Sequence, residues 1–314
     1  MKLSCTRIFQ VCAASALFVS ALCVMNACTV SNDAVSYEST GNVKSHGNGG
    51  NGSSEGDDTT DVDTTGTSSG NFDVGTAFED YSKYLQFERV RAMSIARGNV
   101  KYSVSAFFIA TTEVTQGLYK DVMGSLPDQT RDGDALPVSD VSWYDAVLFC
   151  NALSKKVGLD TVYVYDSVGE KNYLKNLTIE YSRAGVRLPT ETEWELAARG
   201  GTETRFYWDV EDASDYAYYG QSKGPVEVGG FKPNDYGLYD MAGNVAEWVN
   251  DWYSAYSSSD QVNPTGPKTG TTKCVRGGGW ADKVADIAPK EREKKDPLYH
   301  GAALGFRVVY SGGF

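Results

Sequence analysis

Thiol and imidazole side chains are scarce in this sequence, which limits the chemistry that it could perform. Of 314 residues, six are cysteine and two are histidine, and four of the cysteines lie close to the amino terminus. Cys150 and Cys274 are therefore the thiols left for nucleophilic or metal-binding roles in the rest of the chain. With His46 in a polar amino-terminal segment, His300 alone cannot supply the imidazoles of a multi-histidine centre.

A site built from a nucleophile, a histidine and a carboxylate is a second kind of chemistry to consider. It would need His300 to stand beside an activated serine or cysteine. No nucleophile-elbow sequence lies near His300. We therefore interpret His300 as a loop residue, and the charged run 290–296 as a solvated surface segment.

The amino terminus has the features of an export signal. Lys2 and Arg7 precede a mostly apolar run over residues 8–24, which is typical of a secretory signal and too short for a permanent membrane span. A small residue then precedes Cys28, and this arrangement resembles a bacterial lipobox. We predict a signal peptide over residues 1–28, lipidation at Cys28 and anchorage of the exported chain in a membrane of the bacterial cell envelope. Simple secretion and an uncleaved anchor are the alternatives.

A polar segment follows the predicted signal. Residues 29–75 consist largely of Gly, Ser, Thr, Asn and Asp, with eight acidic residues and a single Lys44. Such a segment cannot bury enough apolar surface to offset the entropy lost on ordering. We predict a disordered acidic linker over residues 29–79, which holds one folded domain over residues 80–314 away from a membrane.

Export also bears on the two remaining thiols, because oxidising compartments permit disulfides. The sequence does not fix the distance between Cys150 and Cys274, so a bridge and two separate thiols both stay open. We favour two buried thiols, since free cysteine is among the most buried residue types.

The net charge of −12 excludes one class of partner. Binding to nucleic acid needs a basic patch that neutralises phosphates, and this chain is acidic. Much of the negative charge lies in the predicted linker, so we interpret the charge as a source of solubility and expect no nucleic-acid partner.

The elements that would position any site can be predicted from capping residues. Three short helices are expected to begin after Thr115, Ser142 and Thr190. Asp145 and Glu193 stand three residues beyond the second and third of these caps, which is the spacing of a capping box. The rest of the domain is rich in Gly, Asn, Asp and Tyr and holds short apolar runs, such as 105–110 and 306–310. This pattern predicts an α+β domain with short strands and many loops.

Several motifs follow one another in a recognisable order. They are Glu113–Gln116 (EVTQ), Val141–Ala146 (VSWYDA), Arg187–Gly201 (RLPTETEWELAARGG), Asn234–Trp248 (NDYGLYDMAGNVAEW), Arg276–Trp280 (RGGGW) and Gly305–Arg307 (GFR). Over about residues 84–310 this series resembles the formylglycine-generating enzyme, or sulfatase-modifying factor, family. The resemblance implies a loop-rich variant of the C-type lectin fold.

The resemblance also shows which chemistry is missing. Family members that make formylglycine use two cysteines between the RGGSW-like motif and the final GFR, where the thiolates bind copper(I). In this chain that interval, residues 281–304, contains no cysteine. Cys274 lies before the RGGGW motif, and Cys150 matches a helical position that is not catalytic. We therefore expect no catalytic residues and no copper.

A structural calcium ion is a further implication of the resemblance. Carried over by position, its ligands would be the side chains of Asp240 and Glu247 and the backbone carbonyls of Gly243 and Val245. Asp240 replaces the usual Asn, which keeps an oxygen donor and adds charge suited to a hard cation. The alternative is a metal-free loop held by hydrogen bonds from Asn244 and Glu247.

These observations favour a non-catalytic surface module that binds a protein, peptide or glycan. Its binding face would comprise the loops 216–219 and 253–256 and the segment 281–304, because tyrosine-rich loops can stack on sugars or anchor peptides. One alternative is a scaffold component of an envelope complex. Another is a formylglycine-generating oxidase, or a related enzyme with altered chemistry.

Overall fold

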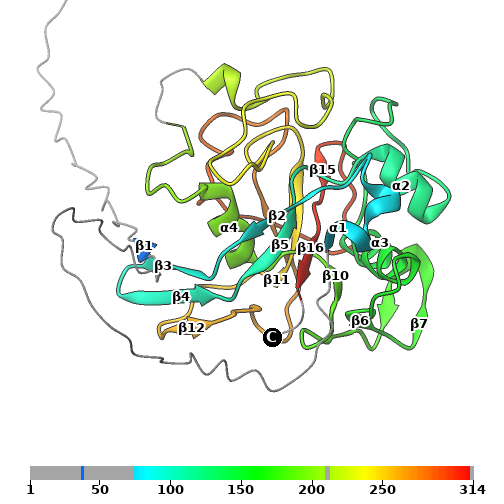
Figure 1. Cartoon of the computed structure of the whole chain (residues 1–314), viewed down its shortest axis with the longest axis horizontal. Helices are drawn as coiled ribbons and strands as arrows, with labels where there is room; N and C mark the ends of the chain where they lie inside the picture. Colours follow the sequence, from blue (N-terminus) through cyan, green and yellow to red (C-terminus); the bar gives the residue numbers. More distant parts are fainter. Residues whose placement is uncertain (1–36, 39–73, 209–212, 312–314) are drawn as a thin grey trace, which may run out of the picture. The chain divides into compact units, whose positions relative to one another are not determined.

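The computed structural model describes residues 37–38, 74–208 and 213–311 (Figure 1). The predicted signal peptide 1–28, with Cys28, lies outside these residues, as does most of the predicted linker. Among the helices of the described ranges, none combines the length and the apolar character that crossing a membrane requires.

The described strands form three four-stranded sheets and two two-stranded ones. Their orders are β1-β3-β4-β12, β10-β16-β5-β2, β14-β13-β11-β15, β6-β9 and β7-β8. The strands are β1 (Tyr37–Glu38), β2 (Phe87–Val90), β3 (Met93–Arg97), β4 (Val100–Val104), β5 (Phe107–Ala110), β6 (Tyr163–Val164), β7 (Ser167–Val168), β8 (Leu174–Lys175), β9 (Thr178–Ile179), β10 (Gly185–Arg187), β11 (Ala246–Trp252), β12 (Gln261–Val262), β13 (Lys273–Arg276), β14 (Glu293–Lys295), β15 (Leu304–Gly305) and β16 (Val309–Ser311).

Helices are fewer and mostly short. The α-helices are α1 (Val74–Ala77), α2 (Gln116–Met123), α3 (Trp143–Lys156) and α4 (Glu191–Arg199), and the 3₁₀ helices are η1 (Glu79–Tyr81), η2 (Glu170–Asn172) and η3 (Ala213–Asp215). In Figure 1, α2 and α3 lie on one side of the central strands β5, β16 and β11, and α4 lies on the other. The predicted α+β architecture of short strands and long loops is what the structure shows.

The three predicted helices are confirmed with their capping residues. Their N-caps are Thr115, Ser142 and Thr190. Ser142 forms a capping box with Asp145, and Thr190 forms one with Glu193, so each side chain satisfies a backbone N–H of the first turn. α4 ends at Gly200 with a φ of +58°, a left-handed conformation that a residue with a Cβ rarely adopts.

The core also includes a residue just before the predicted start of the domain at residue 80. Phe78 is buried and its ring centroid lies 4.9 Å from that of Phe87. Aromatic burial of this kind ties residues 74–79 to the core, although the residues before them are polar. The backbone of β1, inside the predicted linker, also pairs antiparallel with β3.

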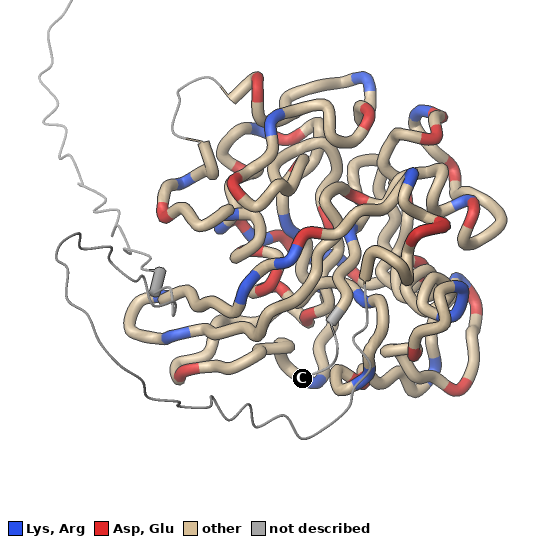
Figure 2. The backbone as a smooth tube through the Cα atoms, viewed as in Figure 1, with Lys and Arg blue, Asp and Glu red and all other residues tan. Residues whose placement is uncertain are grey.

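Two buried clusters form the core. One surrounds α2 and α3 and includes Phe149 and Phe306, and the other surrounds α4 and includes Trp194. Trp248 on β11 belongs to the first cluster, and its indole N–H donates to the carbonyl of Val141 at 2.9 Å. Because β11 packs against α4 as well, it places side chains in both clusters. Figure 2 shows lysine and arginine interspersed with acidic residues along the described trace.

Candidate functional site

β11 brings three of the sequence motifs together. Glu247 on this strand lies opposite Arg276 of β13 in antiparallel register and opposite Gly305 of β15 in parallel register. The end of the NDYGLYDMAGNVAEW motif, the start of the RGGGW motif and the start of the final GFR are therefore neighbours in space. This arrangement places the predicted calcium loop and the segment 281–304 on adjoining parts of the same sheet.

Glu247 is fully engaged by protein groups. Its carboxylate forms an ion pair with Arg307, with Nη2 2.8 Å from Oε1, and it accepts a hydrogen bond of 2.7 Å from the indole of Trp194. All three side chains are buried. A charged pair in this position is stabilised by its mutual attraction and would be costly to break.

Two further carboxyl groups lie beside this ion pair without a cation of their own. Asp240 accepts a hydrogen bond of 2.7 Å from the backbone N–H of Gly229, and its carboxyl group interacts electrostatically with that of Glu113. Burial raises the pKa of Asp240 to about 6, and burial together with the charge of Asp240 raises the pKa of Glu113 well above its usual range. The Oε2 atom of Glu113 is buried and has no hydrogen-bond partner among the described residues.

These observations test whether the residues fit the predicted calcium ion. Three buried carboxyl groups surround Arg307, and the orphaned oxygen of Glu113 is the kind of donor that a hard cation would satisfy. However, the carboxylate of Glu247 is already bonded to Arg307 and Trp194. Within the described ranges, no three acidic, histidine or cysteine side chains gather closely enough to hold a metal ion. The fit is therefore better for Asp240 and Glu113 than for Glu247.

The two backbone positions of the predicted set are tightly placed. Gly243 has a φ of +82°, and a Cβ there would stand 2.3 Å from the carbonyl oxygen of Tyr218, so only glycine fits. The N–H of Val245 points to Oε1 of Glu113 at 3.5 Å. Asn244 accepts a hydrogen bond from the N–H of Val226, as the metal-free alternative requires. Calcium at Asp240, Gly243, Val245 and Glu247 stays a prediction.

Glu113 is the residue of this cluster that the sequence analysis did not assign to a site. It belongs to the EVTQ motif, where it follows β5 and is flanked by buried Val114. Its place just after the apolar run of β5 was the available signal. Its contact with Asp240 could not be predicted, because the two residues are far apart in the chain.

Both thiols of the domain are free and buried, as expected. Burial raises the pKa of Cys150 and of Cys274, so neither is a ready thiolate. The thiol of Cys274 lies 3.6 Å from Oε2 of Glu191. The structure therefore offers neither thiol as a replacement for the cysteines missing from residues 281–304.

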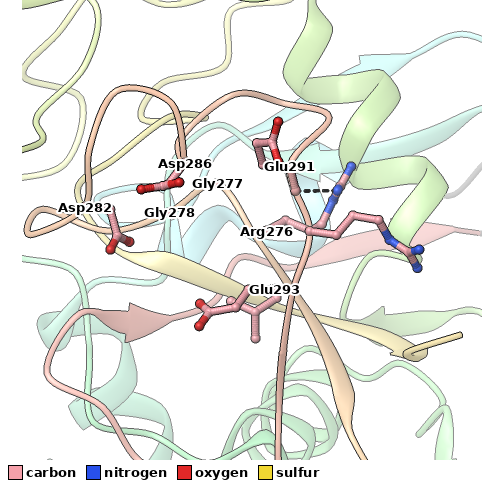
Figure 3. A pocket seen from close by; sticks show the side chains of 9 residues that line it. Arg276, Gly277, Gly278, Asp282, Asp286, Glu291 and Glu293 are labelled. Carbon is pink, nitrogen blue, oxygen red and sulfur yellow. Dashed lines mark hydrogen bonds between the residues drawn. The ribbon is translucent and has the colours of Figure 1, made fainter. Parts of the chain in front are cut away.

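Residues 281–304 run past the glycines of the RGGGW motif and leave a cavity of about 250 Å³ beside them. Figure 3 shows the carboxylates of Asp282, Asp286 and Glu293 around this cavity, with Arg276 joined to Glu291. Gly278 has a φ of +63°, and a Cβ at this position would lie 2.8 Å from Cγ2 of Ile287. The turn therefore packs too closely against the segment 281–304 for a residue other than glycine. The segment thus bounds the space near Gly278 without filling it.

Arg276 anchors this segment through the backbone. Its guanidinium donates to the carbonyl oxygens of Pro289 at 2.7 Å and Lys290 at 3.2 Å, and to that of Glu291. On its other side it pairs with Glu195 at 2.8 Å. Because the carbonyls belong to the main chain, this anchorage does not depend on which side chains the segment carries.

A second arginine ties the segment to the loop 253–256. Arg292 forms an ion pair with Glu191 on α4, and it donates to the carbonyl of Ser254 at 3.0 Å. Its guanidinium also lies 4.5 Å from the ring centre of Tyr253 and 4.1 Å from that of Tyr256. These contacts place the predicted loop 253–256 beside residues 281–304.

The loop 216–219 adjoins the start of the segment 281–304, whereas the loop 253–256 contacts Arg292 further along it. The N–H groups of Gly220 and Gln221 donate to the carbonyls of Asp282 and Trp280 at 2.8 and 2.7 Å. The structure therefore brings together all three parts of the predicted binding face. His300 also lies in this region as a loop residue, with Nδ1 3.0 Å from the carbonyl of Asp140.

Comparisons with known proteins agree with this geometry. Residues 54–311 match the sulfatase-modifying factor enzyme 1-like domain. The chain is 34% identical to the chaperone protein LppX of Paenibacillus barcinonensis over 67% of its length and 81% of that protein. It is 39% identical to the formylglycine-generating enzyme of Thermomonospora curvata over 31% of its length, but spans only 39% of that enzyme.

A solved structure supports the same relationship. The Treponema denticola variable protein 1 superposes with a TM-score of 0.66 and 33% sequence identity, over 72% of this chain and 95% of that one. The predicted fold is confirmed by this likeness together with the matched domain. The chain therefore belongs to the sulfatase-modifying factor, or formylglycine-generating enzyme, family.

Proposed function

We propose that this chain is an exported, lipid-anchored and non-catalytic module that binds a polypeptide through the face formed by residues 281–304 and the adjoining loops. The observation that carries the proposal is the anchorage of this segment by Arg276 and Arg292. Arg276 holds backbone carbonyls of residues 289–291, and Arg292 ties the segment to the carbonyl of Ser254 and to Glu191, so the segment is fixed while many of its side chains stay exposed. Val284 and Tyr299 are 40% and 44% exposed on this face.

The absence of cysteine from residues 281–304 supports a role other than oxidation. The relative LppX is named as a chaperone, and binding of polypeptide is the property that a chaperone needs. Exposed aromatic and apolar side chains among charges of both signs are suited to peptide contacts. An envelope location, with Cys28 as the lipid anchor, is part of the same proposal.

The test uses the full-length chain, extracted in mild detergent, against peptide and glycan arrays. Tyr299→Ala combined with Val284→Ser should weaken peptide binding about tenfold or more, because aromatic anchors carry much of such interfaces. Val262→Ser is the matched control, since Val262 is 77% exposed and lies on β12.

Three outcomes would overturn the proposal. One is an empty array with folded protein, and another is an equal loss of binding in the Val262→Ser control. The third is copper or iron in the purified chain together with oxygen consumption in the presence of a thiol peptide, which would favour the enzymatic alternative. Purification in a stable complex with several envelope proteins would favour the scaffold.

A further inference from the structure

A second and larger cavity lies away from the predicted calcium loop and is used by nothing described so far. It has a volume of about 870 Å³ and lies among α3, the strands β8 and β9, the end of β11 and the loop 264–271. Ligand pockets of small molecules are commonly of this size and are lined mainly by apolar and aromatic side chains. This cavity has the same character, with Trp143, Tyr144, Tyr173 and Trp252 on its walls.

The strand register creates the deepest part of this cavity. Trp252 of β11 lies opposite Lys273 of β13, after an irregularity in the pairing that begins at Trp248. A bulge of this kind re-aims side chains, and here it turns Lys273 between two indole rings. The rings of Trp143 and Trp252 are stacked, with centroids 6.4 Å apart.

Lys273 is a buried cation with few partners. Its ammonium lies 3.8 Å from the ring centre of Trp143 and 3.9 Å from that of Trp252, and it donates to the carbonyl of Asn250 at 2.8 Å. Among the described residues it makes no ion pair and no second hydrogen bond, although an ammonium has three N–H donors. The side chain is 1% exposed, so bulk water does not supply what is missing.

The loop 264–271 forms one wall of the cavity and packs against the end of β11. A Cβ at Gly270 would stand 2.7 Å from Cβ of Trp252, and one at Gly266 would stand 2.9 Å from Cβ of Asp251. The glycines therefore let the loop approach β11 closely. Trp252 is thereby fixed, and the cavity keeps a preformed aromatic wall.

The charges of the lining indicate the sign of a ligand. The charged side chains that line the cavity are Lys268, Lys273 and Asp296, so the lining is net positive in a chain whose net charge is −12. Asp296 and Lys268 are exposed at the rim, and the oxygen Oδ1 of Asp296 accepts from the N–H of Leu298. Lys273, in contrast, is buried at the inner wall of the cavity.

We propose that this cavity binds a small aromatic carboxylic acid, with its ring against Trp252, Tyr144 and Tyr173 and its carboxylate on Lys273. A carboxylate accepts the N–H groups that Lys273 leaves unused and neutralises a buried charge. The flat aromatic walls suit a ring in offset or edge-to-face contact. Burial lowers the pKa of Lys273 to about 7, although the charge of Asp251 opposes this shift.

The experiment compares 2-naphthoate with its neutral analogue 2-naphthalenemethanol by isothermal titration calorimetry on the full-length chain. We expect the carboxylate to bind about tenfold or more tightly than the alcohol, as charge-assisted hydrogen bonds allow. Lys273→Met should remove this difference between the two probes. Lys268→Met at the rim is the matched control and should retain most of it.

A second variant keeps the test valid where Lys273→Met fails to fold. Thr178 is exposed on β9 and lines the same cavity, so Thr178→Trp narrows the cavity at its wall and leaves Lys273 in place. This variant should weaken binding of both probes. The proposal is wrong if neither probe binds the wild type, if the two bind equally, or if Thr178→Trp binds both as the wild type does.

Discussion

Two groups of buried carboxylates in this domain differ in the number of arginines that accompany them. Glu195 on α4 is within ion-pair distance of Arg97, Arg199 and Arg276, at 2.6, 3.0 and 2.8 Å. Although burial opposes ionisation, these arginines lower the pKa of Glu195 to about 2. By contrast, Arg307 is the one cation among the described residues that Glu113, Asp240 and Glu247 share, and the first two have raised pKa values.

The difference shows what each group contributes. In the arginine-rich group the carboxylate of Glu195 is fully paired, and the same group holds the backbone of residues 289–291 through Arg276. The carboxylate-rich group is short of positive charge, and it must take up a proton or a cation to be stable. One group therefore fixes a surface segment, and the other is stable only with a bound proton or a bound cation.

The largest effect is expected from Arg276→Met. It would leave the carbonyls of residues 289–291 without their donor and remove one partner of Glu195, so unfolding should become easier by about 3–5 kcal/mol. Urea denaturation measures this change. Lys232→Met is the control, because its pair with Asp215 is more than half exposed on both sides and should matter by less than about 1 kcal/mol. Equal effects of the two substitutions would contradict the comparison.

The next effect concerns calcium and the carboxylate-rich group. If Ca²⁺ binds there, a concentration of about 100 times its Kd should stabilise the fold by about 2.7 kcal/mol. Glu113→Gln should weaken this response, since it removes the donor that lacks a partner, and should not lower stability in the presence of EDTA. Differential scanning fluorimetry with Ca²⁺, with Mg²⁺ and with EDTA would show it. An unchanged melting temperature in all three conditions would argue for the metal-free loop.

The pH dependence of stability should have opposite signs in the two groups. The folded pKa of Asp240 is raised to about 6, so the native state holds an extra proton and stability in EDTA falls as pH rises from about 4 through 6, by about 2 kcal/mol. Asp240→Asn should flatten this fall. The folded pKa of Glu195 is lowered to about 2, so its contribution is present above pH 4.5 and is lost on acidification. A wild-type profile that rises between pH 4 and 6 would contradict this assignment.

Local features of the fold were predictable because they depend on residues close in the chain. The caps at Ser142 and Thr190 lie within three residues of their partners, and their boxes formed as predicted. Arg187 lies six residues before Glu193 in the same motif, and the two form an ion pair at 2.7 Å. The apolar runs at 105–110 and 306–310 became β5 and β16, which pair with each other.

The parts that could not be predicted depend on contacts between distant residues. Glu113 meets Asp240, and Lys273 meets Trp143, across more than a hundred residues of sequence. Neither contact has a local pattern that would indicate it. The burial of Phe78, just before the predicted start of the domain, likewise depends on its contact with Phe87 and not on the composition of the residues around it.

The two buried thiols provide a measure of how the domain opens. Cys150 belongs to the cluster around α2 and α3, and Cys274 belongs to the cluster around α4. A thiol-specific reagent can reach each of them only when its own cluster exposes it. The ratio of the two labelling rates, followed by peptide mass mapping, would therefore distinguish a domain that opens in one step from one whose halves loosen separately.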